Sequence, residues 1–181
     1  MGRYKIVDDN GIYFTTHTIV DWLPVFKERK YFEIVTSSLN HCQEKKGLAI
    51  FGYVIMLTHF HLVAQTEDGV KFHEVMRDMK RFTSKEISRQ LESDGQKLFL
   101  HVFKKAAERE KGKRMYKIWQ DEYHPQIIYS DKVCYQKIDY MHNNPLRKGF
   151  VEKPEDWLFS SARNYANDDH SILKVELLQM L

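Results

Sequence analysis

The sequence has few of the residues that crosslink or interrupt a chain, with two cysteines, four prolines and eight glycines among 181 residues. Cys42 and Cys134 are far apart and fit no CxxC or disulfide pattern, so a reducing compartment is expected. The longest apolar run, Leu48 to Leu57, is about half as long as a membrane span requires. The N-terminal stretch MGRYKIVDDN has no apolar segment of the kind found in secretory signals. These absences favour a soluble cytoplasmic protein.

Internal repeats, low-complexity tracts and linkers rich in Pro, Gly or Ser are also absent from the sequence. No internal boundary is therefore indicated, and we expect residues 1–181 to form a single domain. A chain of this length can bury a hydrophobic core without disulfides or metal ions to hold it together.

Charge of one sign is not in large excess, since the net charge is only +3. Its distribution, however, is uneven. Between Lys71 and Lys117 there are 14 Lys and Arg against 7 Asp and Glu, whereas the rest of the chain has 14 against 18. A basic central segment on a mildly acidic body favours a polyanionic partner such as nucleic acid, although a solvated helical face would give the same pattern.

Hydrophobic periodicity predicts strands and helices in alternation. The predicted elements are, in chain order, a strand at 11–19, a helix at 23–46, one bent strand or two strands across 48–66, a helix at 70–91, a second helix just after it, a strand at 126–129 and a helix at 131–143. Gly47 and Pro145 are expected to end helices, Ser130 is a good N-cap, and Ser93 with Gln96 matches a capping box. This order is typical of an α+β, ferredoxin-like plait, in which helices cover one face of an antiparallel sheet and the other face can hold a site.

The segment MLTHFHLVA, residues 56–64, contains two histidines in an otherwise apolar run. Because side chains alternate across a strand, His59 and His61 point to one face while Phe60 and Leu62 point to the other. Imidazoles two residues apart are separated by about 6 to 7 Å of backbone, close enough to bind one divalent ion. Two hydrogen-bonded core histidines would show the same pattern.

A second polar pair, Tyr140 and Asn144, lies four residues apart in IDYMHNNPLRKG, so both side chains share one flank of the predicted helix. Considered alone, they could be a surface tyrosine and an asparagine at a helix end. Two imidazoles and a carboxamide oxygen can, however, hold a hard divalent ion, and a nearby tyrosine can attack a group that the ion polarises.

Three stretches, GYVIMLTHFHLVAQ, IWQDEYHP and QKIDYMHNNPLRKGFVEKPEDWLFSSARNY, resemble the single-tyrosine HUH transposases, and most closely the REP-associated tyrosine transposases. They occur in the family's order, and the match runs from about Tyr13 to Tyr165, nearly the whole chain. The resemblance implies that His59 and His61 are metal ligands, that Asn144 is the third ligand and that Tyr140 is the nucleophile. The family usually has Pro-Asn before the first histidine, where this chain has Leu57 and Thr58.

A regular strand would point Thr58 away from the face of the histidines, so the metal ligands are expected to survive this departure. The resemblance also implies cleavage of single-stranded DNA, with hairpin or palindromic DNA as the partner and Mg²⁺ or Mn²⁺ as the cofactor. Attack by the tyrosine would leave a 5′-phosphotyrosine and a free 3′-hydroxyl. A second 3′-hydroxyl could then reverse the step and join new strands.

Basic and aromatic residues of the central segment are the candidates for holding DNA. Several of the basic residues are spaced four apart on one predicted helix, as in a stripe of phosphate contacts. The candidates are Arg77, Lys80, Arg81, Lys85, Lys104, Lys105, Lys113, Arg114, Trp119 and His124. For Trp119, stacking on an unpaired base and simple packing are both open.

Two other functions fit parts of the sequence. A nucleic-acid-binding module on the same plait, with a site no longer used for transposition, accounts for the basic segment. A metal-binding structural domain leaves Tyr140 and that segment unexplained. A homodimer is possible and a monomer is not excluded, since Tyr140 could serve the histidines of its own chain or of a partner.

Overall fold

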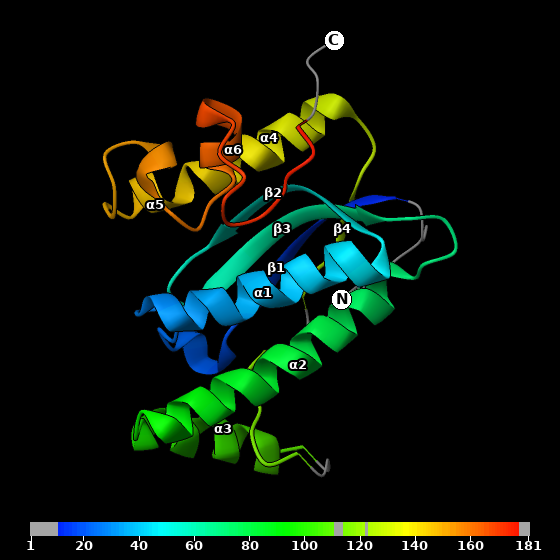
Figure 1. The fold of residues 1–181 in the computed structure, drawn as a ribbon. Helices are drawn as coiled ribbons and strands as arrows, with labels where there is room; N and C mark the ends of the chain where they lie inside the picture. The colour runs from blue at the N-terminus through cyan, green and yellow to red at the C-terminus, as the bar shows by residue number, and fades with distance from the viewer. Residues whose placement is uncertain (1–10, 111–113, 122, 178–181) are drawn as a thin grey trace.

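A four-stranded antiparallel sheet forms the centre of the computed structural model, which describes residues 11–110, 114–121 and 123–177 (Figure 1). The strand order is β2-β3-β1-β4. The strands are β1 (Ile12–Thr18), β2 (Leu48–Ile55), β3 (His59–Thr66) and β4 (Gln126–Ile128). This is the ferredoxin-like arrangement that the element order predicts, and the segment at 48–66 forms two strands rather than one bent strand.

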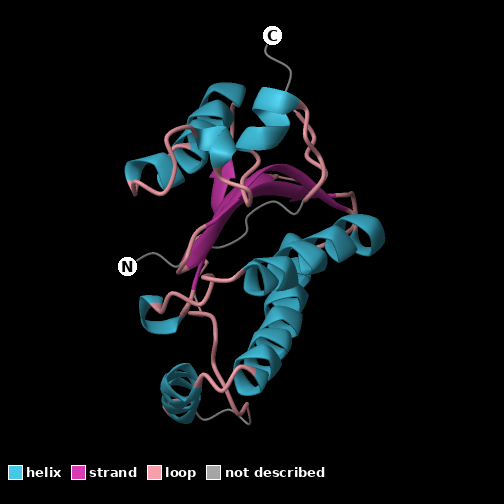
Figure 2. Cartoon of the chain, turned by 60° about the vertical axis from the view of Figure 1, so that its left-hand side comes forward, coloured by secondary structure: helices cyan, strands magenta, loops and turns pink. Residues whose placement is uncertain are grey.

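Helices cover both faces of the sheet (Figures 1 and 2). The helices are α1 (Arg29–Lys46), α2 (Phe72–Ser93), α3 (Lys97–Glu108), α4 (Asp131–His142), α5 (Asn144–Arg147) and α6 (Ala162–Asn167), with short 3₁₀ turns η1 (Val20–Trp22) and η2 (Pro154–Asp156). Long α1 and α2 lie on one face, whereas α4 crosses the other and contacts β2, β3 and β4. Helix α4 therefore partly covers the face of the sheet that was expected to be free for a site.

The alternation along β3 separates two hydrophobic clusters. Phe60, Leu62 and Ala64 lie in the larger cluster, which packs against α1 and α2. Val63 lies in the smaller cluster, together with Cys134, Ile138 and Met141 of α4. The predicted two-faced pattern of this strand is confirmed.

Helix ends follow the expected chemistry at two positions and differ at others. Gly47 ends α1 in the left-handed region with φ of 59°, and the Ser130 hydroxyl accepts a hydrogen bond from the Val133 amide at the start of α4. The predicted Ser93–Gln96 capping box is wrong. Ser93 is the last residue of α2, and Gln96 precedes α3 without a side-chain cap, because Gly95 turns the chain with φ of 65°.

Pro145 does not stop helical geometry as sharply as expected. It lies in the first turn of α5, where a missing backbone N–H costs little, and α5 begins at Asn144 immediately after α4 ends. The predicted strand at 126–129 ends one residue early, at Ile128, and the Tyr129 side chain beyond it is 81% exposed.

Gly52 sets how closely α4 approaches the sheet. It lies at a register irregularity in β2, and a Cβ atom there would come within 2.9 Å of the Met141 side chain and 3.2 Å of Ile138. A residue without a side chain therefore allows the helix to lie directly on the strand. Elsewhere, the segment after η2 covers the edge of β2, with Ile55 donating to Phe159 and Ser161 donating to Tyr53.

Within the described residues, α2 and the other helices lack an apolar stretch long enough to cross a bilayer.

Candidate active site

The two histidines lie at the start of β3, paired across the sheet with Thr18 and Thr16 of β1. The ring centroids of His59 and His61 are 4.9 Å apart, with their planes at 74°. His61 is 5% exposed, whereas His59 is half-buried. The strand therefore presents two imidazoles side by side at the edge of the α4 face.

Threonine hydroxyls hold one nitrogen of each ring. The Thr16 hydroxyl is 2.8 Å from Nδ1 of His61, and the Thr58 hydroxyl is 2.9 Å from Nδ1 of His59. If each Nδ1–H donates to its threonine, Nε2 is the nitrogen available to a metal ion. The expectation that Thr58 points away is wrong, because β3 begins only at His59 and Thr58 belongs to the preceding bend.

Both imidazoles are held neutral by their surroundings. Burial lowers the pKa of His59 to about 4, with a smaller contribution from the charge of Lys148. Burial also lowers the pKa of His61 to about 3, and the charges of His59 and Lys137 add to this effect. A neutral imidazole is the form that coordinates metal ions.

Helix α4 brings Tyr140 to the histidines of its own chain. The Tyr140 ring centroid is 5.7 Å from that of His61 and 6.4 Å from that of Phe14, and the side chain is 43% exposed. Phe14 in turn stacks on His61 at 5.3 Å. The phenol is thus packed beside the imidazole pair while remaining accessible to a substrate.

Asn144 begins α5 one turn after Tyr140, and its side-chain Nδ2 atom is buried without a hydrogen-bond partner among the described residues. The described residues hold no group of three His, Cys, Asp or Glu that could bind a metal. The structure places the two imidazoles side by side, and a donor set of these rings and the Asn144 amide would fit a divalent ion with open positions.

Three cations surround this cluster, and the sequence patterns did not single them out. The Arg147 guanidinium lies 5.3 Å from the centre of the Tyr140 ring, and the Lys137 ammonium lies 4.7 Å from the centre of the Phe14 ring. Lys148 acts electrostatically on His59. Lys137 could have been found from its spacing, since it precedes Tyr140 by three residues and so shares its flank of the helix.

The turn η1 places an exposed tryptophan beside the site. Trp22 is 57% exposed, and its ring meets His59 edge-on at a centroid distance of 5.5 Å. Asp21 and Trp22 have φ of 54° and 53°, in the left-handed region. That conformation costs about 1 to 3 kcal/mol for each residue other than glycine.

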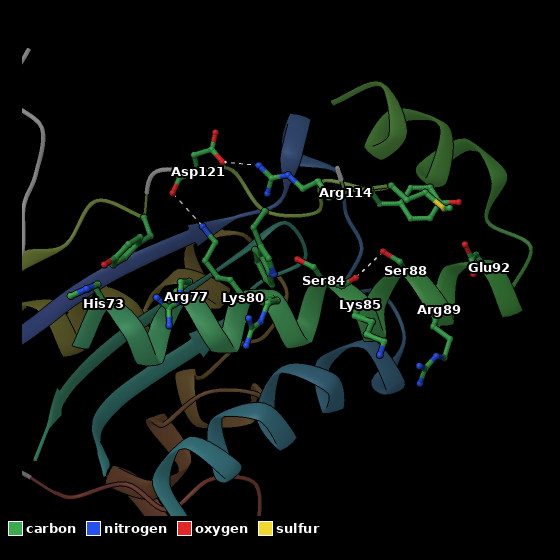
Figure 3. Close-up of a pocket in the computed structure, with 15 residues that line it drawn as sticks. His73, Arg77, Lys80, Ser84, Lys85, Ser88, Arg89, Glu92, Arg114 and Asp121 are labelled. Carbon is green, nitrogen blue, oxygen red and sulfur yellow. Dashed lines mark hydrogen bonds and ion pairs between the residues drawn. The ribbon is translucent and has the colours of Figure 1, made fainter. Parts of the chain in front are cut away.

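The basic candidates lie on the other face of the sheet. A groove of about 900 Å³ runs along α2 and is bounded on its other side by the chain that carries Arg114 and Asp121 (Figure 3). The candidates that line this groove are Arg77, Lys80, Arg81, Lys85, Arg114 and Trp119. Arg89 of α2 also lines it. We refer to this surface as the basic groove.

The remaining candidates lie elsewhere. Lys104 and Lys105 are exposed on α3 but do not line the groove, and neither does His124, which has φ of 42°. Lys113 lies outside the described residues. The structure therefore gathers only part of the predicted DNA-binding set on one surface.

Lys80 and Trp119 line the groove, but each is hydrogen-bonded within the protein, unlike a freely exposed cation or aromatic ring. Burial lowers the pKa of Lys80 to about 8, and its ammonium donates 2.6 Å to the carbonyl of Gln120. Trp119 is 3% exposed, and its indole N–H donates 3.0 Å to the Thr83 hydroxyl. Of the two roles left open for Trp119, packing is the one that the structure supports.

Tyr123, which was not predicted, also lines the groove. Its ring stacks on His17 at 5.2 Å, and His17 stacks on Phe60 at 4.4 Å. The signal that could have identified it is its position in the IWQDEYHP stretch, between Trp119 and His124.

Comparisons with known proteins agree with the motifs. No family model matches the chain. A Haemophilus influenzae protein that is provisionally assigned as a REP-associated tyrosine transposase is 26% identical over 156 residues, covering 83% of this chain and 79% of that protein. A solved REP-associated tyrosine transposase bound to a REP hairpin matches 100% of this chain and 95% of its own, with a TM-score of 0.62 and 19% identity. The expected resemblance is confirmed: this chain is similar in sequence to a REP-associated tyrosine transposase and has the fold of one.

Proposed function

We propose that this protein is a metal-dependent enzyme that nicks single-stranded DNA and transfers strands, with Tyr140 as the nucleophile. The observation that carries the proposal is the position of the half-exposed Tyr140 ring, 5.7 Å from the buried His61 ring in the same chain. An accessible phenol beside two neutral imidazoles is suited to attack on a phosphodiester.

DNA is the proposed substrate for two independent reasons. The relative of known structure was solved with a REP hairpin, and the Haemophilus protein shares its assignment. The basic groove provides Arg77, Arg81, Lys85 and Arg89 along one helix, at a spacing that suits a phosphate backbone. Hairpin or palindromic DNA is therefore the substrate class that we propose.

In the proposed reaction, the phenolic oxygen of Tyr140 forms a bond to phosphorus and the bond from phosphorus to the 3′ oxygen breaks. The phenolic proton is lost, and the 3′ oxygen leaves as a hydroxyl. The product is a 5′-phosphotyrosine, which conserves the energy of the phosphodiester. A second 3′-hydroxyl can therefore reverse the step and join two strands.

The chain's own residues orient the reacting groups. Thr16 and Thr58 fix the two imidazoles, and Phe14 packs against both His61 and Tyr140. Arg147, beside the phenol ring, is positioned to stabilise negative charge that develops on the phosphate and on the phenolic oxygen. Mg²⁺ or Mn²⁺ held by His59, His61 and Asn144 would polarise the scissile phosphate.

The decisive experiment is detection of a covalent adduct. The protein is incubated with a labelled single strand that contains a hairpin, in Mg²⁺ or Mn²⁺, and separated under denaturing conditions. An SDS-resistant adduct is expected for the wild type and is expected to disappear in Tyr140→Phe. Tyr129→Phe is the matched control, because Tyr129 is an exposed tyrosine just before α4 and should leave the adduct intact.

Binding without an adduct on any such strand would contradict the enzyme and favour the DNA-binding module. Because Tyr140 packs against the histidine of its own chain, we propose that one chain contains a complete site, whether or not the protein dimerises. An inactive Tyr140→Phe chain mixed with an inactive His61→Gln chain should therefore not regain activity.

A further inference from the structure

Trp22 differs from the other two tryptophans of the chain. Trp119 and Trp157 each donate their indole N–H to a partner, namely the Thr83 hydroxyl and the Ile55 carbonyl. Trp22 is 57% exposed, and its ring lies 5.5 Å from that of His59. A large apolar ring is thus left facing solvent at the edge of the candidate active site.

The backbone that carries this ring is strained, although the strained conformation does not bury the side chains. Asp21 and Trp22 have consecutive positive φ angles of 54° and 53°, yet both side chains are exposed. Core packing of these two side chains therefore does not account for the strained turn. Strain of this kind is typical of positions at which a side chain is held for binding or catalysis.

Backbone hydrogen bonds on both sides of the turn fix the position of its backbone. The Ile19 amide donates 2.9 Å to the Thr58 carbonyl, directly before His59, and the Val20 amide donates 2.9 Å to the Ile118 carbonyl. The Phe26 amide donates 3.0 Å to the Leu57 carbonyl beyond the turn. Trp22 is therefore tied to the same backbone segment that carries the first histidine.

We propose that Trp22 stacks on an unpaired base of the DNA strand at the nucleotide next to the phosphate that Tyr140 attacks. This inference rests on the proposed function and names the residue that positions its substrate. Arg147 and Lys148 lie by the site and can hold backbone phosphates, while the indole face takes a base. A base reaches an aromatic face only when it is unpaired, so Trp22 selects a single-stranded segment at the histidines.

Tryptophan fluorescence measures this stacking without any cleavage. In a Tyr140→Phe protein without added metal, an unlabelled single strand is expected to quench the emission, because Trp22 is the most exposed tryptophan. Trp22→Ala should lose that quenching and bind the strand about tenfold more weakly, since stacking on one base contributes about that much. Trp22→Tyr should keep most of the affinity.

Substrate variants then locate the base. Each nucleotide of the strand is replaced in turn by an abasic residue, and the position whose loss abolishes quenching should adjoin the phosphate at which the wild type forms its adduct. Tyr129→Ala removes another exposed aromatic and should change neither the quenching nor the affinity. Thermal unfolding of Trp22→Ala should match the wild type, because the ring is exposed.

The outcomes separate this inference from the proposed function. If folded Trp22→Ala retains the quenching and the affinity, stacking by Trp22 is refuted even when the adduct forms normally. If quenching depends on Trp22 but the wild type forms no adduct on any strand, the nicking enzyme is refuted and stacking at the histidines stands. An abasic position far from the cleaved phosphate would refute the placement of the base.

Discussion

The histidine site and the basic groove lie on opposite faces of one sheet and are built in different ways. The site is small and packed, with His61 buried between Phe14, Thr16 and Tyr140. The groove is long, and its cations have acidic partners such as the half-buried Asp78, which pairs with Arg77 and Arg81. The first can fix reacting atoms, whereas the second can attract and hold a polyanion without ordering it closely.

His61 on β3 and His17 on the neighbouring β1 show the same difference between the two faces of the sheet. His61 faces α4, where the rings of His59 and Tyr140 lie beside it. His17 faces α2, fully buried between Phe60 and Tyr123, and burial lowers its pKa well below the usual value. The residue type alone therefore does not identify a ligand, because the face of the sheet decides which neighbours it meets.

Loss of a histidine should produce the largest effect and should separate chemistry from binding. His61→Gln is expected to lower the rate of adduct formation at least about 100-fold, because loss of a ligand should exceed the 10- to 100-fold effects of its supporting residues. The affinity for hairpin DNA, measured without metal, should change by less than about twofold, because the cations of the groove are untouched. An equal loss of affinity would show that the two regions are not independent.

Loss of the hydroxyl beside His59 should produce the next largest effect. Thr58→Val is expected to weaken Mn²⁺ binding about 10-fold, since the imidazole loses the group that orients it. The measurement is titration calorimetry on Tyr140→Phe protein. Thr58→Ser keeps a hydroxyl and should restore most of the affinity, whereas an equal defect in both variants would argue against the orienting bond.

Neutralising the groove should weaken DNA binding and spare the chemistry. Arg81→Gln combined with Lys85→Gln should lower the slope of log affinity against log salt by about 1.4 to 1.8, or about 0.7 to 0.9 for each phosphate that the protein no longer neutralises. Lys104→Gln combined with Lys105→Gln removes the same charge from α3, outside the groove, and is the matched control. Equal slopes of log affinity against log salt for the two double variants would show that the groove is not part of the DNA interface.

The smallest effect on DNA affinity is expected at Thr83 and Trp119, whose contact serves only to pack the protein. Thr83→Val leaves the buried Trp119 N–H without its acceptor and should cost about 1 to 3 kcal/mol of unfolding free energy in chemical denaturation. DNA affinity should stay within about twofold of the wild type, since Trp119 is buried. A large loss of DNA affinity in a variant that remains folded would instead indicate that Trp119 stacks on a base.

Local patterns predicted the sheet well because their causes are local. The alternation around Phe60 and Leu62 follows from strand geometry, and Gly47 ends α1 because it tolerates positive φ. The capping box at Ser93 failed because α2 continues through that residue and packs Leu91 into the core. Helix length there depends on tertiary burial, which a four-residue motif does not contain.

The fold class, the shared face of His59 and His61 and the resemblance to tyrosine transposases could be predicted from the sequence, because periodicity and motif order are properties of the chain. Tertiary packing was needed to bring Tyr140 against His61, since α4 must cross the sheet closely at Gly52. It also decided that Thr58 contacts His59 and that Trp22 stands beside it. These contacts join residues from separate elements, and packing rather than local preference sets their distances.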